Sequence, residues 1–280
     1  MDVQAVFGDM AVGKFVSEYL HRLPLALAGS AHGVCELGTW ETLGEILRAA
    51  GVDVMVVRDG KRYAGALTAE AVDARARTLS DEGYTILVRH AERHHAGLGA
   101  LARSFERTFL APVNIHMYAT PSGRRGFSWH YDAEDVFILQ TAGEKEYSLR
   151  KNTVNPWPLE ETLPEDMRYE RELMPLSRVL LRAGDLLYIP CGYWHKAEAA
   201  ATGETAISLA VGVMSRSAVD VLDLVRREAT ESLLWRQRLP VGEKLSAPAL
   251  AEMFAQLGAD LAQRFNDPLL AERLIAWLRR

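Results

Sequence analysis

Two histidines and one aspartate carry the clearest chemical signal in the sequence. His130 and Asp132 are two residues apart, so that on an extended strand both side chains leave the same face. His195 ends the run Gly184–His195, in which a Gly-Asp turn, an apolar strand and a Pro-Cys-Gly bend precede the histidine. Two imidazoles and one carboxylate on one face of a metal leave three coordination positions open, as in non-heme Fe(II) sites. A structural zinc site would need a fourth protein ligand.

The spacing of the first pair is not specific by itself. A His-x-Asp pair also suits a solvated edge strand, and residue types alone favour that interpretation. The turn, strand and bend before His195 make the metal site the better interpretation of the two segments together. We expect Asp135, three residues after Asp132, to orient this turn rather than to bind metal.

Seven strand-like runs must position these side chains. Turn signals such as Ala-Gly, Gly-Asp and Thr-Gly separate most of them, and short strands at this spacing predict a sandwich or a barrel. Residues 152–175 hold four prolines among acidic residues and are expected to be an insertion between strands. The runs are Val113–Ala119, Val136–Thr141, Glu146–Leu149, Arg178–Leu181, Leu186–Ile189, His195–Glu198 and Ile207–Val213.

Mixed elements precede the strands. Residues 1–110 are mainly helical by periodicity, with strands predicted at Val52–Val57 and Thr85–Val88. Thr39 is expected to cap a helix that runs through Leu47.

A helical segment follows the strands. Helices are predicted at Val219–Leu234, Leu250–Leu257, Leu261–Phe265 and Leu269–Leu278. We therefore expect a first domain at 1–215, with mixed elements at 1–110 and a barrel core at 111–215, and a second segment at 216–280.

Composition narrows the class of protein. The chain has 280 residues, is 49% hydrophobic, and carries 32 basic against 37 acidic residues, a net charge of −5. A protein that binds nucleic acid by charge neutralisation would be basic, so no direct nucleic-acid partner is expected. Two cysteines, Cys35 and Cys191, indicate free thiols in a reducing compartment. The N-terminus does not look like a secretory signal and no run is long and apolar enough to span a membrane, so we expect a cytoplasmic protein.

Several segments resemble one known family. Residues from about 83 to 215 are similar to the JmjC/cupin 2-oxoglutarate oxygenases, and most of all to their ribosomal-oxygenase branch. The resemblance implies an α+β protein with a mainly β core: a double-stranded β-helix (cupin or jelly-roll) with N-terminal mixed α/β elements and a C-terminal helical segment. The matching segments are Asn114–Gly123, Gly126-Phe127, His130–Asp132, Asp135–Gln140, Gly143–Lys145 and Gly184–His195.

The resemblance also implies roles for individual residues. His130, Asp132 and His195 match the ligands of Fe(II). Lys145 and Tyr118 match the residues that hold the far carboxylate of 2-oxoglutarate, the co-substrate. From the residues alone, Lys145 could equally be a solvated turn lysine and Tyr118 a core tyrosine on a barrel strand. Further hydroxyl contacts to 2-oxoglutarate are expected from Thr120 and Ser208.

The family's chemistry is the hydroxylation of protein side chains, with succinate and CO₂ as co-products. We therefore expect an Fe(II)/2-oxoglutarate-dependent dioxygenase that hydroxylates a protein or peptide side chain. The alternatives are a hydroxylase of a small natural-product intermediate and a JmjC-type N-methyl-lysine demethylase. A non-enzymatic alternative is a metal-binding cupin that serves as an interaction module, although such a module has no need of both Lys145 and Tyr118 at those offsets.

The segment after Ser215 resembles the family's dimerisation helices. Residues 216–224 and 236–240 carry that resemblance. An apolar helix stripe needs a partner to cover it, so we expect a homodimer formed through the C-terminal helices.

Overall fold

The computed structural model describes residues 2–65, 67–165, 174 and 176–279. It has two compact units, Met1–Ser215 and Arg216–Arg280, and each is described by itself. In the described part of the chain, no helix combines the length and the apolar character needed to cross a membrane.

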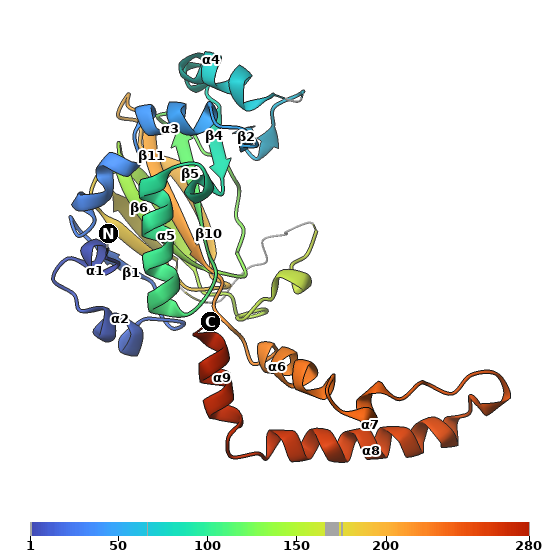
Figure 1. Ribbon diagram of the computed structural model, residues 1–280. Coiled ribbons are helices and arrows are strands. Elements are labelled where there is room, and N and C mark those ends of the chain that lie inside the picture. The colour runs from blue at the N-terminus through green and yellow to red at the C-terminus, as the bar shows by residue number, and fades with distance from the viewer. Residues whose placement is uncertain (1, 66, 166–173, 175, 280) are drawn as a thin grey trace. The chain divides into compact units, whose positions relative to one another are not determined.

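The first unit is built on two antiparallel sheets (Figure 1). The larger sheet has eight strands in the order β1-β9-β6-β11-β5-β4-β2-β3, and the smaller has three in the order β10-β7-β8. This arrangement is a cupin-type double-stranded β-helix with a mainly β core, as predicted. The strands are β1 (Leu25–Leu27), β2 (Asp53–Arg58), β3 (Lys61–Arg62), β4 (Thr85–Arg89), β5 (Val113–Thr120), β6 (Asp135–Ala142), β7 (Lys145–Arg150), β8 (Ser177–Leu181), β9 (Leu186–Ile189), β10 (Trp194–Ala199) and β11 (Ala206–Val213).

Alternation along the central strands creates two faces. On β5, Ile115, Met117 and Ala119 belong to the main hydrophobic core, so residues 114, 116, 118 and 120 lie on the opposite face. That opposite face belongs to the space between the sheets, where side chains of β6, β7, β8 and β9 form a second apolar cluster. The site develops in this inner space.

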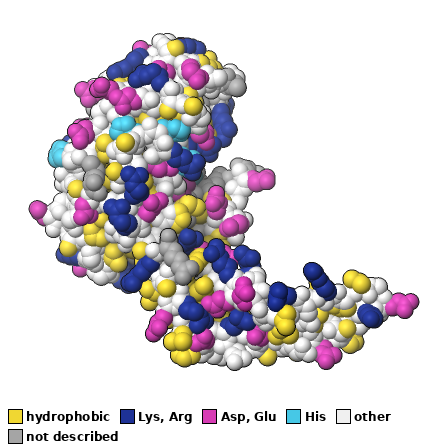
Figure 2. Space-filling view, in the orientation of Figure 1, with side chains coloured by type: hydrophobic (Ala, Val, Ile, Leu, Met, Phe, Trp, Pro, Cys, Tyr) yellow, Lys and Arg dark blue, Asp and Glu magenta, His cyan; other side chains and the backbone are white. Residues whose placement is uncertain are grey.

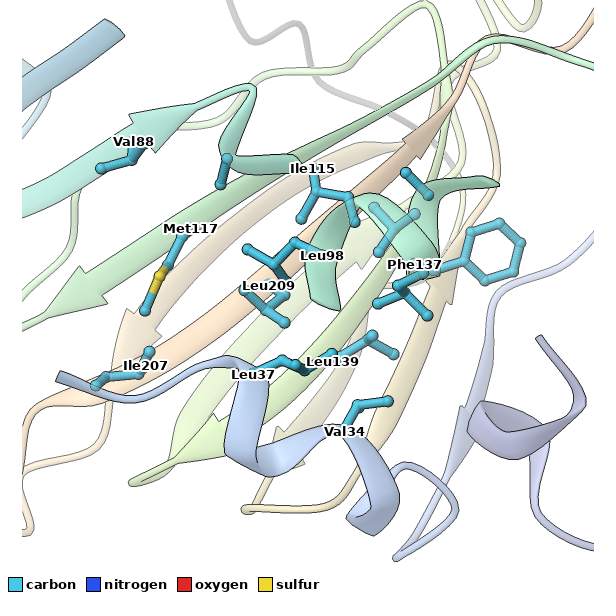
Figure 3. Packing of buried hydrophobic residues seen from close by; sticks show 14 of the residues in the cluster. Val34, Leu37, Val88, Leu98, Ile115, Met117, Phe137, Leu139, Ile207 and Leu209 are labelled. Carbon is cyan, nitrogen blue, oxygen red and sulfur yellow. The ribbon is translucent and has the colours of Figure 1, made fainter. Parts of the chain in front are cut away.

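Helices cover the outer face of the large sheet. Figure 3 shows Leu98 of α5 pointing at Ile115 and Leu209 of the sheet. Thr39 caps α3 as predicted, because its hydroxyl accepts a hydrogen bond from the backbone N–H of Thr42. The helical elements of this unit are α1 (Gln4–Phe7), α2 (Val12–Glu18), η1 (His32–Leu37), α3 (Trp40–Leu47), α4 (Ala69–Asp81), η2 (Ala91–Arg93), α5 (Ala96–Phe109) and η3 (Glu160–Thr162).

The second unit is helical and has a small core. Leu224, Val225 and Leu270 form its buried apolar cluster, and Arg273 bridges Glu228 and Asp267 at 2.7 Å each. Its elements are α6 (Asp220–Ala229), α7 (Leu233–Arg236), η4 (Gly242–Lys244), α8 (Ala247–Phe265) and α9 (Leu270–Leu278).

Two helix predictions for this unit are wrong. The helix expected at Val219–Leu234 breaks after Ala229, where the Thr230 hydroxyl donates to the carbonyl of Arg227 and competes with helix continuation. Conversely, the two short helices predicted at Leu250–Leu257 and Leu261–Phe265 are one continuous helix, α8. Strong helix formers on both sides outweigh the cost of Gly258, which is about 1 kcal/mol.

The expected insertion lies between β7 and β8. Its described residues are irregular apart from the single turn η3, as the prolines predict. Residues 166–173 and Pro175 of that prediction lie outside the described residues.

Candidate metal centre

The segment that carries His130 and Asp132 is a loop rather than a strand, so this part of the prediction is wrong. Its one sheet-like pairing is an isolated bridge between His130 and His195, with N–O distances of 3.1 and 2.8 Å. The Gly192 N–H also donates to the Asp132 carbonyl at 2.9 Å. These hydrogen bonds use the backbone N–H and C=O of His130 and the C=O of Asp132. They hold the loop against the segment that carries His195.

The three side chains converge on one point. One ligand atom from each of His130, Asp132 and His195 lies within 4.8 Å of the others, and the described residues offer no other cluster of this kind. His195 Nε2 is 3.4 Å from Asp132 Oδ2, and the two imidazole rings are 4.2 Å apart between centroids. His195 is buried, whereas His130 and Asp132 are half-buried and can be reached from the cavity.

Backbone carbonyls orient both imidazoles for metal binding. His130 Nδ1 lies 2.8 Å from the Ser128 carbonyl, and His195 Nδ1 lies 3.0 Å from the Tyr193 carbonyl. A carbonyl can only accept, so each Nδ1 carries the proton and each Nε2 presents its lone pair. Burial and the neighbouring His130 lower the pKa of His195 to about 4, which keeps that ring in the neutral, metal-binding form. The donor set therefore fits a divalent ion with a partly open coordination sphere.

Asp135 is not part of this cluster, in line with its expected orienting role. It is buried and accepts hydrogen bonds from the Tyr188 hydroxyl at 2.5 Å and the Ser215 hydroxyl at 2.7 Å. His21 Nε2 lies 3.0 Å from Asp135 Oδ2, the oxygen that also accepts from Ser215. Burial alone would raise the pKa of Asp135, but these partners, led by His21, lower it. The carboxylate thus ties the start of β6 to β9 and fixes the turn beyond Asp132.

Lys145 is a buried cation in the same cavity. It is 4% exposed, and its Nζ lies 3.3 Å from the Ser208 hydroxyl and 5.3 Å from the ring centroid of Tyr118. Within the described ranges no acidic side chain forms an ion pair with it. Burial lowers its pKa to about 8 and raises that of Tyr118, which therefore remains a protonated donor. A buried ammonium without a charged partner is energetically unfavourable, and binding an anionic ligand would compensate its charge.

These groups line one cavity of about 150 Å³ between the two sheets. Tyr118, Thr120 and Lys145 line it together with the three metal-site residues. Ser208 does not line the cavity, but its hydroxyl lies 3.3 Å from the Nζ of Lys145, which does. The structure therefore brings together all seven residues singled out in the sequence.

The pairing register of β5 with β11 explains why there is room for the cavity. Tyr118 pairs with Ser208, His116 with Ala210, and Asn114 with Gly212. Each large inward residue of β5 thus stands opposite a small residue of β11. Small side chains on one strand leave room that larger ones would fill.

One further cavity residue, Glu134, did not emerge from the sequence. Its carboxylate lines the cavity and accepts a hydrogen bond of 2.8 Å from the Asn114 amide. Burial and the negative charge of Asp132 raise its pKa to about 7. The sequence signal is a glycine within a strand, one residue before its end: a Cβ at Gly212 would meet the Glu134 carboxylate.

Comparisons with known proteins agree with this architecture. Residues 95–221 match the model of the JmjC domain. A bifunctional lysine-specific demethylase and histidyl-hydroxylase NO66 of Dictyostelium discoideum is 37% identical over 120 residues, covering 41% of this chain and 23% of that protein. Ribosomal oxygenase 2 of Bos taurus is 36% identical over 114 residues, covering 41% of this chain and 24% of that protein. The chain thus spans about a quarter of the length of these relatives.

Solved structures match over almost the whole chain. The X-ray structure of Escherichia coli ycfD has a TM-score of 0.63 at 18% identity, covering 96% of this chain and 71% of that one. The structure of YcfD, a ribosomal oxygenase from Escherichia coli, in complex with cobalt and 2-oxoglutarate has a TM-score of 0.61 at 18% identity. The match covers 97% of this chain and 71% of that one. At this identity the likeness establishes the fold.

Proposed function

We propose that this chain, which contains a JmjC domain, is an Fe(II)- and 2-oxoglutarate-dependent dioxygenase that hydroxylates a side chain of a protein or peptide. The observation that carries the proposal is the shared cavity: three metal donors with their Nε2 and carboxylate atoms converging, and an unpaired buried lysine beside them. Neither feature stabilises a fold by itself, because unpaired buried charge is costly.

His130, Asp132 and His195 would hold the iron. The Ser128 and Tyr193 carbonyls keep the two imidazoles in the correct tautomer, and Asp132 supplies the negative charge that favours a divalent ion. With three protein donors, three positions remain for other ligands.

Lys145 would bind the far carboxylate of 2-oxoglutarate, with Tyr118 and Thr120 as hydrogen-bond donors and Ser208 orienting the ammonium. When bound, iron and 2-oxoglutarate supply the activation of O₂, with succinate and CO₂ as co-products and one oxygen atom transferred to the substrate. The protein's contribution is to position these ligands and to keep water out of a largely buried cavity.

A protein or peptide substrate is supported by the activities for which the relatives are named, a histidyl-hydroxylase and a ribosomal oxygenase. Demethylation of an N-methyl-lysine is the second candidate, because the Dictyostelium relative carries that activity in its name as well. Both reactions need the same metal site and differ in the product: a gain of one oxygen or the loss of a methyl group.

We further propose a homodimer formed through the second unit, and a cytoplasmic location. Apolar side chains lie among charged ones along the surface of that unit (Figure 2). They include Val219, Leu222, Leu233 and Phe254, which are 54%, 50%, 78% and 58% exposed. The two unpaired cysteines, Cys35 and Cys191, suit a reducing compartment.

Oxygen uptake tests the proposal. Purified protein with Fe(II), ascorbate and 2-oxoglutarate should consume O₂ and produce succinate, and the Asp132→Ala variant should not. Glu161→Ala, at an exposed position, is the matched control and should behave as wild type. Equal uptake by wild type and Asp132→Ala would refute the oxygenase proposal.

A further inference from the structure

One buried hydroxyl of the cavity has no partner within the protein. Thr85 of β4 is 0% exposed and lines the cavity. Among the described residues, none forms a hydrogen bond with its Oγ1. The side-chain oxygens of Asn114 and Gln140 share this property, but these two residues do not line the cavity. Buried hydroxyl groups are nearly always hydrogen-bonded, so Thr85 is a candidate contact for a ligand of the cavity.

The alternation of β4 places Thr85 on the inner face of the large sheet. Ile86 and Val88 belong to the main hydrophobic core on the outer face, so Thr85 lies on the opposite face. β4 pairs with β5 through Ile86 and Ala119. One position further along these two antiparallel strands, Thr85 comes to lie beside Thr120, and both threonines line the cavity.

The loop before the metal site encloses the Thr85 side chain. Gly126 packs on it so closely that a Cβ at this glycine would lie 3.4 Å from Cγ2 and 3.5 Å from Oγ1 of Thr85. The Gly126 carbonyl accepts a hydrogen bond of 2.7 Å from the Gly60 N–H, which fixes this part of the loop. The next residue, Phe127, lines the cavity, and its ring stands edge-on to Tyr118. The loop therefore closes around Thr85, and the cavity is left as the side from which a partner can reach it.

Thr85 extends a patch of hydroxyl groups around Lys145. The Lys145 Nζ lies 3.3 Å from the Ser208 hydroxyl and 5.3 Å from the ring centroid of Tyr118. Ser208 pairs with Tyr118 from the β11 side of β5. Thr85 flanks Thr120 from the other side of β5, where β4 lies. Three neighbouring strands thus contribute hydroxyl groups to the cavity wall near this buried cation.

We propose that Thr85 is a further residue that binds 2-oxoglutarate, its hydroxyl donating a hydrogen bond to an oxygen of the far carboxylate. This inference rests on the proposed function, in which Lys145 and Tyr118 hold the same carboxylate. A carboxylate has about four lone-pair sites, so it can accept from the ammonium, the phenol and the threonine hydroxyl together. Bound in this way, the co-substrate compensates two unfavourable groups at once: the buried charge of Lys145 and the unbonded hydroxyl of Thr85.

Replacing the hydroxyl tests the inference through binding and stability. Thr85→Val puts a methyl group of nearly the same size in its place. On Mn(II)-loaded protein, calorimetry should show 2-oxoglutarate bound about 10- to 100-fold more weakly than by wild type, the range for a hydrogen bond to a charged group. Mn(II) affinity should be unchanged, because Thr85 is not among the three clustered donors. Without ligands, the variant should melt about 2–4 °C above wild type, because it no longer buries an unbonded hydroxyl.

Three comparisons separate the hydroxyl from the shape of the side chain. Thr85→Ser keeps the hydroxyl and should bind 2-oxoglutarate nearly as tightly as wild type. Thr78→Val makes the same change at an exposed position of α4 and should leave binding unchanged. 2-Oxopentanoate has a methyl group in place of the far carboxylate, so wild type and Thr85→Val should not differ in their affinity for it.

Unchanged 2-oxoglutarate affinity in Thr85→Val, an equal loss in Thr85→Ser, or a similar loss for 2-oxopentanoate overturns the inference. A Thr85→Val protein that melts below wild type also overturns it, because the hydroxyl would then have a partner inside the protein. Failure of wild type to bind 2-oxoglutarate refutes the proposed function instead. The two failures are distinguishable, because the inference is read from the difference between wild type and its variants.

Discussion

Replacing Lys145 by methionine should stabilise the protein and impair its function at the same time. Burial lowers the pKa of this ammonium from 10.5 to about 8, so the fold holds a charge that it does not compensate. At about 1.4 kcal/mol for each tenfold change in proton affinity, that pKa difference corresponds to about 3 kcal/mol of destabilisation near neutral pH. Methionine fills a similar volume without the charge, and water that reaches the cavity reduces the gain, so we expect Lys145→Met to be about 1–3 kcal/mol more stable without ligands.

The sign of the pH dependence follows from the lowered pKa. The folded protein binds this proton more weakly than the unfolded chain, so the cost is fully present below about pH 8. It diminishes as the pH rises towards the unfolded pKa, where both states have lost the proton. The difference in unfolding free energy between Lys145→Met and wild type should therefore shrink in alkaline buffer, and denaturant titrations at several pH values measure it.

Binding of 2-oxoglutarate should change in the opposite direction. Loss of a charge-assisted pair to the far carboxylate should weaken 2-oxoglutarate binding about 10- to 100-fold, as measured by calorimetry on Mn(II)-loaded protein. Mn(II) affinity should be unchanged, because Lys145 is not among the three clustered donors. Lys151→Met, at an exposed position, is the control and should alter neither quantity. Unchanged 2-oxoglutarate affinity in Lys145→Met, or a variant less stable than wild type, would refute the reasoning.

Three other predictions concern the fold and the assembly. Gly143→Ala places a Cβ 2.8 Å from the Thr205 carbonyl oxygen at a φ of +62°, and should cost at least about 2 kcal/mol in thermal melts. Gly203→Ala has open space at a φ of +87° and should cost about 1 kcal/mol, so equal losses would contradict the packing argument. Asp135 raises the pKa of His21, mainly through their hydrogen bond, so this pair stabilises the fold fully below about pH 6.5 and loses its effect as pH rises through the folded pKa. His21→Gln should therefore lower the melting temperature more at about pH 6 than at about pH 9, and an equal loss at both would count against the pair. Leu222→Glu should convert the proposed dimer into a monomer in sedimentation experiments, and a wild-type protein already monomeric at micromolar concentration would exclude the dimer.

The sheets could be predicted because their pattern is local. Each of the seven runs between Val113 and Val213 is confirmed within one residue at either end, since alternation and turn residues define a strand without reference to the rest of the chain. Two strands were missed: β1, which has three residues, and β3, which has two. Strands this short are defined by their partner rather than by their own sequence.

The immediate surroundings of the metal site could be predicted less well. Residue types suggested the convergence of His130, Asp132 and His195, but the loop conformation of the first two depends on backbone bonds to a segment some sixty residues away. Glu134 remained hidden for the same reason. A glutamate beside a turn is usually solvated, and only the register of β5 with β11 reveals that Asn114 and Gly212 hold it inside.

Crystallisation with Fe(II) and 2-oxoglutarate in the absence of oxygen, with the iron located by anomalous diffraction, tests the central claim most directly. We expect one ion bonded by His130, Asp132 and His195, with 2-oxoglutarate on the same ion and its far carboxylate at Lys145. An ion elsewhere, a fourth protein donor that closes the coordination sphere, or 2-oxoglutarate bound away from Lys145 would contradict it.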